Sequence, residues 1–241
     1  MDIVGSFRAT DGVELRYTHR DNGSHQVIIV VPGILMHRDS VEHRSLAERL
    51  SAICDVVSLD VRGHGDSGGR FTWGVKEPGD LAELTASLRK RDPRLGVLGF
   101  SFGGVHAIVA AALNGGFDAV AAVGAPHRLF ILDHNPLSRR LLRTLPLAVR
   151  RRRRWTRLAF APLAKARPSE LIGLVSPTPV LIVHGTDDWL ISVGHALRLY
   201  ERAAEPRTLQ LVERGLHAEF MLADDPEPLL DPLTRFFEAV L

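Results

Sequence analysis

Apolar positions along the chain fall into short runs that alternate with amphipathic stretches. The runs "QVIIVVPG" (26–33) and "RLGVLGF" (94–100) are short and glycine-containing, and the first is rich in β-branched residues, as buried parallel strands are. Similar runs occupy 55–63, 118–126 and 178–185, and residues 207–215 are typical of an outer strand. Helical spacing is found between them, at 40–53, 78–90, 102–113, 193–203 and 232–241. This order predicts an α/β fold, with a mostly parallel sheet and helices on both faces.

Two segments depart from the alternation. Residues 7–23 place the turn pairs Asp11-Gly12 and Asn22-Gly23 around alternating residues, which predicts a β-hairpin. Residues 127–177 are rich in leucine, alanine and arginine and are interrupted by prolines. We expect them to form a short helical cap, laid over the sheet of a single domain spanning 1–241.

The chain's length and composition agree with one domain. Its 241 residues, 45% of them apolar, are enough to bury one sizeable core. Residues 1–12 carry acids where a secretory signal needs an apolar run, and no stretch approaches the roughly 18 apolar residues of a membrane span. These features predict a cytoplasmic protein. The single cysteine, Cys54, has no partner for an internal disulfide and is expected to be a small buried hydrophobic residue.

Positive charge is concentrated in the predicted cap. The net charge is +2, yet eleven Lys/Arg and no acid lie between Asp133 and Glu170, so the rest of the chain sums to 2 − 11 = −9. These basic residues are Arg139, Arg140, Arg143, Arg150, Arg151, Arg152, Arg153, Arg154, Arg157, Lys165 and Arg167. A solvated cap surface is the favoured interpretation. An anionic membrane surface is an alternative that suits the mixture of leucine, tryptophan and arginine. No nucleic-acid partner is expected because no aromatic interleaving accompanies the arginines. Oligomeric state is not indicated.

A serine stands in a tight bend at the end of one predicted strand. "GFSFG" (99–103) places Ser101 after the strand at 94–100 and before a helix, where ligands bind in parallel sheets. The glycines at 99 and 103 leave room for a sharp turn that exposes the hydroxyl. The N–H of Phe102 would then point from the helix start toward the group that Ser101 attacks. Ser101 is the candidate nucleophile.

A base and an acid follow Ser101 in the chain. A serine hydroxyl is a poor nucleophile until a positioned base removes its proton, and a third group must orient that base. "HGTDDWLI" follows the strand at 178–185 and offers the carboxylates of Asp187 and Asp188. "GLHAEF" offers His217 after the strand at 207–215. The histidines at positions 64, 106 and 184 are assigned structural roles.

These motifs resemble the α/β-hydrolase family over nearly the whole chain. "DVRGHGDSGG" (60–69) is similar to a loop of monoacylglycerol lipase-like and lysophospholipase-like members, and serine aminopeptidase-like members are also similar. The resemblance implies that Asp188, in the Gly-x-x-Asp stretch that begins at residue 185, is the acid, with Asp187 as the weaker choice. It also implies an oxyanion hole formed by the N–H groups of Ile34 and Phe102. In this chain Pro32 stands where the family has histidine in a His-Gly pair.

Candidate substrate-contacting residues surround these motifs. They are Gly33, Leu35, His37, Leu129 and Trp189. His37, Arg38 and Asp39 could line the entrance, but a solvated loop with a helix cap at Asp39 or Ser40 is the favoured interpretation.

The resemblance implies a serine hydrolase that cleaves a carboxylic ester of a small or lipid-like acyl substrate through an acyl-enzyme. No cofactor or metal is expected. Thioesterase, peptidase and acyltransferase activities remain alternatives on the same triad, and a non-catalytic ligand-binding module remains an alternative of another class. A dehalogenase is disfavoured because that activity places Asp where Ser101 stands.

Overall fold

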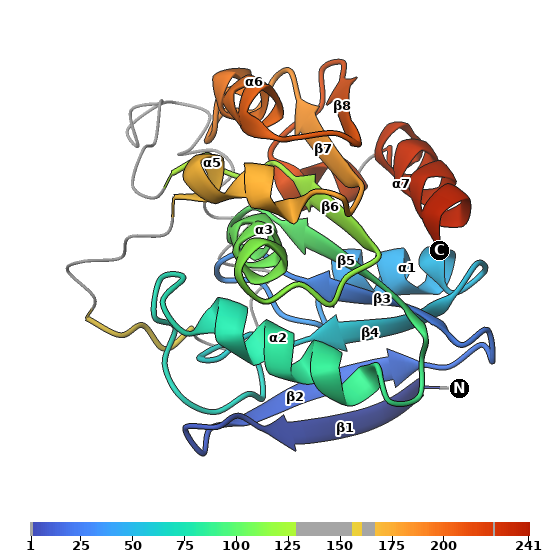
Figure 1. The fold of residues 1–241 in the computed structure, drawn as a ribbon, viewed down its shortest axis with the longest axis vertical. Helices are drawn as coiled ribbons and strands as arrows, with labels where there is room; N and C mark the ends of the chain where they lie inside the picture. Colours follow the sequence, from blue (N-terminus) through green and yellow to red (C-terminus); the bar gives the residue numbers. More distant parts are fainter. Residues whose placement is uncertain (1, 129–155, 161–166, 224) are drawn as a thin grey trace.

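An eight-stranded sheet forms the centre of the structure, with strand order β1-β2-β4-β3-β5-β6-β7-β8 (Figure 1). The computed structural model describes residues 2–128, 156–160, 167–223 and 225–241. The strands are β1 (Asp2–Arg8), β2 (Glu14–Arg20), β3 (Gln26–Val31), β4 (Asp55–Leu59), β5 (Arg94–Phe100), β6 (Ala119–Val123), β7 (Val180–Gly185) and β8 (Arg207–Val212). The helices in these ranges are α1 (Val41–Leu50), α2 (Glu77–Leu88), α3 (Phe102–Asn114), α5 (Pro168–Leu171), α6 (Val193–Arg202) and α7 (Glu227–Val240), with short 3-10 helices η1 (Ile172–Val175) and η2 (Ala218–Leu222).

Strand directions divide the sheet into two parts. β1 and β2 form an antiparallel hairpin, and β2 joins β4 in antiparallel fashion. From β4 to β8 every neighbouring pair is parallel. The predicted hairpin and the mostly parallel sheet are therefore both confirmed.

Helices cover both faces of the sheet and divide the core in two. On one face, α2, α3 and α6 contribute buried side chains, among them Leu84 and Leu199. On the other face α1 and α7 do so, with Leu46 and Phe237. Figure 1 shows α2 and α3 on the opposite side of the sheet from α1 and α7. Successive residues of β3 alternate between the two cores, which explains why this strand is apolar at every position but its first. Each fully buried Val, Leu or Ile contributes about 1.5–3 kcal/mol.

Most predicted elements differ from the observed ones by a few residues at their ends, and two differ more clearly. The predicted strand at 55–63 ends at Leu59, because Asp60 leaves the sheet and its carboxylate accepts hydrogen bonds from backbone N–H groups of Arg38 and Asp66. The predicted helix at 232–241 begins earlier, at Glu227. Pro232 lies inside it near the start, where one missing N–H removes only one backbone hydrogen bond.

The predicted cap is described only in part. Residues 129–155 and 161–166 lie outside the described residues, and with them Leu129 and all the predicted basic cluster except Arg157 and Arg167. The described residues at 168–175 form α5 and η1, which contact α3. Leu158 forms a parallel bridge with Phe71, in the segment that follows the glycine-rich loop at 60–69. No described helix has the length and apolar character needed to cross a bilayer.

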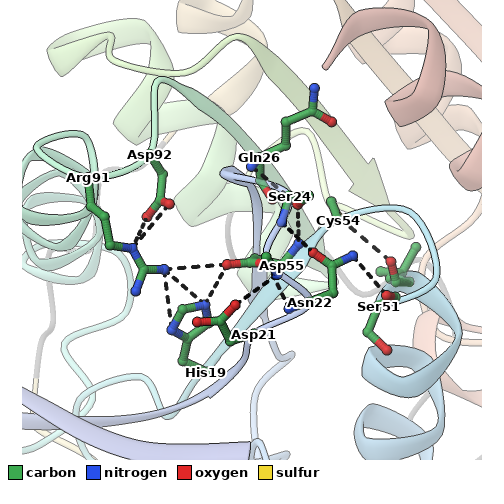
Figure 2. A network of polar contacts seen from close by, with 12 residues as sticks. His19, Asp21, Asn22, Ser24, Gln26, Ser51, Cys54, Asp55, Arg91 and Asp92 are labelled. Carbon is green, nitrogen blue, oxygen red and sulfur yellow. Dashed lines mark hydrogen bonds and ion pairs between the residues drawn. The ribbon is translucent and has the colours of Figure 1, made fainter. Parts of the chain in front are cut away.

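A polar network joins segments at the edge of the sheet where the parallel strands begin (Figure 2). Asp55 accepts a hydrogen bond from the Asn22 N–H at 2.9 Å, and its Oδ2 lies 3.0 Å from His19 Nε2 and 3.4 Å from the Arg91 guanidinium. Ligand atoms of His19, Asp21 and Asp55 lie within 4.8 Å of one another. Because the cationic Arg91 already contacts His19 and Asp55, we interpret this cluster as structural.

Cys54 lies beside this network and is buried, as predicted from the sequence. Burial raises the pKa of its thiol to about 12. The thiolate, which is the reactive form, is therefore scarce at neutral pH.

Candidate active site

The bend that carries Ser101 is a strained turn between β5 and α3. Ser101 has φ 50° and ψ −115°, a backbone conformation that L-residues rarely adopt. Its N–H donates to the carbonyl of Val123 at 2.8 Å. A Cβ at Gly99 would lie 2.3 Å from the carbonyl oxygen of Gly103, and a Cβ at Gly103 would lie 2.1 Å from that of Val31. Only glycine fits at these two positions, because the strand, the turn and the neighbouring strand approach each other so closely.

Three predicted residues meet at the edge where the parallel strands end. His217 Nε2 lies 3.0 Å from Ser101 Oγ, and His217 Nδ1 lies 2.7 Å from Asp188 Oδ2. The three side chains come from the loops after β5, β7 and β8 and are all buried. Asp187, the weaker choice, is exposed and is not part of this chain of contacts. The hydrogen bond to Asp188 favours the tautomer in which Nδ1 carries the proton and Nε2 can accept one from Ser101.

Asp188 is held by more than His217. Its Oδ1 accepts the N–H groups of Leu190 at 2.9 Å and Ile191 at 2.8 Å. Its Oδ2 lies 3.3 Å from His184 Nε2. Burial by itself raises the pKa of Asp188, but the charge of His217 and the hydrogen bonds from His184, His217 and Ile191 outweigh it. The net result is a pKa held below its usual range, so this carboxyl is ionised at neutral pH.

Two backbone N–H groups close to Ser101 in the chain or across the loop after β3 have no acceptor among the described residues. Within the described part of the chain, neither the N–H of Phe102, at the start of α3, nor that of Ile34 has a hydrogen-bond partner. The loop after β3 passes close to Ser101, since a Cβ at Gly33 would lie 3.2 Å from Ser101 Cβ. These two N–H groups are the predicted oxyanion donors.

The other predicted substrate-contacting residues have different positions. Gly33 lies against Ser101, as just described. Trp189 is buried, with its ring centroid 6.4 Å from that of His217. Leu35 is half-buried and has φ 71°. His37 is buried within electrostatic range of Asp60 rather than at an open entrance. Leu129 lies outside the described residues.

The loop from His37 to Asp39 is not the solvated loop that was expected. Arg38 is buried, and its guanidinium pairs with Asp60 and with Asp66, the latter at 3.0 Å. Its N–H also donates to Asp60 Oδ1 at 2.8 Å. A buried charge requires such partners, so the loop is anchored to the glycine-rich loop. Of the two candidate helix caps, Ser40 is the one used, since its Oγ accepts the N–H of His43 at 3.3 Å.

Three histidines that were assigned structural roles are buried. His64 Nε2 accepts the N–H of Leu35 at 3.2 Å, so this residue supports the loop after β3. His106 packs against Phe71 and Phe102. Burial lowers the pKa of both histidines to about 4. His184 contacts Asp188, a role that sequence reasoning missed although the two residues lie only four positions apart.

Glu219 is a further polar residue at the site that sequence reasoning did not identify. It is buried, and its Oε1 accepts the N–H of Gly33 at 2.6 Å. Its place two positions after His217 in "HAEF" is the only local signal, because the partner is distant in sequence.

Comparison with known proteins identifies the class to which this fold and site belong. Residues 28–232 match the alpha/beta hydrolase family, and the chain belongs to this family. It is 31% identical over 207 residues to the uncharacterized protein YqkD of Bacillus subtilis (strain 168), covering 79% of this chain and 64% of that protein. The matched region thus spans less than two thirds of this relative's length.

Solved structures share the fold. The alpha/beta hydrolase GrgF from Penicillium sp. sh18 is 17% identical with a TM-score of 0.85, covering 100% of this chain and 99% of GrgF. The Pyrococcus furiosus esterase Pf2001 is 24% identical with a TM-score of 0.79, covering 100% of this chain and 91% of the esterase. At these identities the likeness concerns the fold.

Proposed function

We propose that this protein is a serine hydrolase that cleaves a carboxylic ester of a small or lipid-like acyl substrate. The proposal rests on two linked hydrogen-bond contacts. Ser101 Oγ lies 3.0 Å from His217 Nε2, and His217 Nδ1 lies 2.7 Å from Asp188 Oδ2. A hydroxyl, an imidazole and an ionised carboxylate in this order can generate an alkoxide-like nucleophile at neutral pH.

The reaction begins when His217 Nε2 accepts the proton of Ser101 while Ser101 Oγ attacks the acyl carbon. The negative charge that develops on the carbonyl oxygen is stabilised by the N–H groups of Ile34 and Phe102, and one such donor is worth about 2.7–4 kcal/mol. His217 then protonates the leaving alcohol oxygen as the carbon–oxygen bond breaks. Asp188 keeps the imidazole in the productive tautomer and stabilises its positive charge.

Water completes the cycle. His217, neutral again, removes a proton from water, and the resulting hydroxide attacks the acyl-enzyme carbon. Collapse of this second tetrahedral intermediate releases the carboxylic acid and returns the proton to Ser101. No other group needs to gain or lose a proton overall.

The residues that would supply the oxyanion donors have apolar side chains, which favours an apolar acyl group. Ile34 and Phe102, which would supply the oxyanion donors, and Trp73 are partly buried apolar residues packed against the core. The ring of Phe102 lies 6.1 Å from that of Trp73, centroid to centroid. The Pyrococcus furiosus neighbour is an esterase, which agrees with the proposal.

The test combines hydrolysis and covalent labelling. Wild type and Ser101→Ala are assayed with p-nitrophenyl esters of increasing chain length, together with a thioester and an amide, and a fluorophosphonate label is mapped by mass spectrometry. We expect ester hydrolysis to fall by at least about 10³-fold in Ser101→Ala and the label to be found on Ser101. Ser45→Ala, at an exposed serine of α1, is the matched control and should behave as wild type. Full ester hydrolysis by Ser101→Ala, or labelling at another residue, would show the proposal to be wrong.

A further inference from the structure

Glu219 is a buried carboxylate that the proposed reaction does not use. It lies in η2 and is 5% exposed. A carboxylate so far removed from water is costly unless it is hydrogen-bonded and paired. Its first partner is the N–H of Gly33, which donates to Oε1 at 2.6 Å. A short hydrogen bond to a charged acceptor is among the stronger ones in proteins.

His43 supports Glu219 from another element. His43 lies on α1 and is fully buried, with its ring edge-on to Phe100 at 5.3 Å between centroids. Its Nε2 lies 3.4 Å from Glu219 Oε1. Burial by itself raises the pKa of Glu219, but His43, the Gly33 N–H and the charge of His217 outweigh it, and the net pKa lies below its usual range. The carboxylate therefore stays ionised.

The hydrogen bond to Glu219 fixes the peptide between Pro32 and Gly33, which directly precedes the peptide that carries the Ile34 N–H. Gly33 is held at both of its polar atoms, since its carbonyl accepts the N–H of Met36 at 3.1 Å. The carbonyl of Gly33 and the N–H of Ile34 belong to one planar trans peptide and point in opposite directions. Because the carbonyl of Gly33 is held toward the N–H of Met36, the N–H of Ile34 points away from Met36.

Gly33 is also confined in space between the carboxylate and the candidate nucleophile. A Cβ on this residue would lie 2.7 Å from Glu219 Oε1 and 3.2 Å from Ser101 Cβ. If the hydrogen bond to Glu219 were lost, the loop could move away from Ser101. Oxyanion donors must be held within about 0.5 Å of the productive position, so a small displacement matters.

We propose that Glu219, supported by His43, is a positioning residue that holds Gly33 so that the N–H of Ile34 stays directed at the oxyanion formed on Ser101. This inference rests on the proposed serine-hydrolase function. It assigns Glu219 a role different from that of Asp188, because Asp188 contacts the imidazole of His217 whereas Glu219 contacts the loop after β3.

The test separates the hydrogen-bond acceptor from the charge. Glu219→Ala removes the acceptor, whereas Glu219→Gln keeps an oxygen that can accept the Gly33 N–H. With a p-nitrophenyl ester that the wild type hydrolyses, we expect kcat to fall by about 10–100-fold in Glu219→Ala, less than for complete loss of a donor, with KM changed by less than about twofold. Glu219→Gln should stay within about threefold of the wild-type kcat.

Controls address folding. All kcat values are normalised by fluorophosphonate titration of the active serine, so that unfolded protein does not count. Glu219→Met, which fills the space without a strong acceptor, replaces Glu219→Ala if the latter does not fold, and should show the same loss of kcat. Asp92→Ala is the matched control, because Asp92 is a fully buried carboxylate paired with Arg91 near the opposite edge of the sheet. It should lose stability while its kcat per titrated site is unchanged.

The outcomes distinguish the two proposals. An active wild type, an inactive Ser101→Ala and an unchanged kcat in Glu219→Ala would overturn the inference on Glu219 alone. An equal loss of kcat in Glu219→Gln and Glu219→Ala would also overturn it, because the charge and not the acceptor would then matter. Absence of hydrolysis by the wild type on every substrate tested would overturn both proposals.

Discussion

His106 provides a prediction about stability and pH. It lies in α3 and is 1% exposed, and neither ring nitrogen has a hydrogen-bond partner within the described residues. Burial lowers its pKa from the ordinary value of 6.5 to about 4, against a smaller opposing effect of Glu77. In the pH range between these two values the unfolded chain binds a proton that the folded chain does not. The titration of His106 therefore leaves the free energy of unfolding unchanged above about pH 6.5 and lowers it progressively as the pH falls toward 4.

The size of the effect follows from the two pKa values. At about pH 5 the unfolded histidine lies roughly 1.5 pH units below its own pKa, and one unit corresponds to about 1.36 kcal/mol, so His106 lowers the free energy of unfolding by about 2 kcal/mol. Replacing it with leucine, which has a similar volume, removes this titration. It also removes two buried nitrogens without partners, which cost about 1–3 kcal/mol when unsatisfied. His106→Leu should therefore be at least as stable as wild type near neutral pH.

The measurement is urea unfolding followed by tryptophan fluorescence at about pH 7.5 and about pH 5. Wild type should lose about 2 kcal/mol more than His106→Leu between the two conditions. Burial lowers the pKa of His64 to about 4 as well, but His64 is present in both proteins, so its effect on stability largely cancels in the comparison. His25→Asn is the control, because His25 is exposed and its positive φ of 58° is tolerated by asparagine. Equal losses of stability in wild type and His106→Leu would refute the reasoning.

Three further substitutions test the site and the bend. Asp188→Asn should lower kcat by about 10³–10⁴-fold while the fold is kept, because the amide can donate to His217 Nδ1 and so favours the wrong tautomer; steady-state kinetics and circular dichroism measure this, and a loss below about tenfold would contradict it. Gly103→Ala should destabilise the protein by about 3 kcal/mol or more, because its Cβ would lie 2.1 Å from the carbonyl oxygen of Val31. Gly79→Ala, in α2 with nothing within 4 Å of the added Cβ, should instead stabilise by about 0.5–1 kcal/mol; thermal unfolding of both variants checks the contrast, and equal effects would argue against the close approach.

The sheet and the bend could be predicted from the sequence because their signals are local. An apolar run that ends in glycine predicts a buried strand from a few neighbouring residues, as it does for β5. Ser101, Asp188 and His217 each follow such a strand. Because parallel strands end at one edge of the sheet, these local signals predict that the three loops lie close together, and the family resemblance singled out Asp188 over Asp187.

The polar contacts that hold the site could not be predicted in this way. Arg38 was expected on a solvated loop and is buried, because its partner Asp60 belongs to another segment. Glu219 lies 186 positions from Gly33. The sequence does not show whether a charged residue is buried or exposed, because this depends on a partner that is distant in sequence and close only in the folded structure.

The loop after β3 is held by two separate segments, and this has a consequence for how the protein loses activity. Glu219 holds Gly33, His64 holds Leu35, and Asp60 holds Arg38. A segment held by both η2 and the glycine-rich loop is restrained as long as these two segments stay in place, so heat or denaturant should abolish turnover only when the core that carries them opens. Catalytic rate, once measured, would then serve as a direct reporter of the folded fraction.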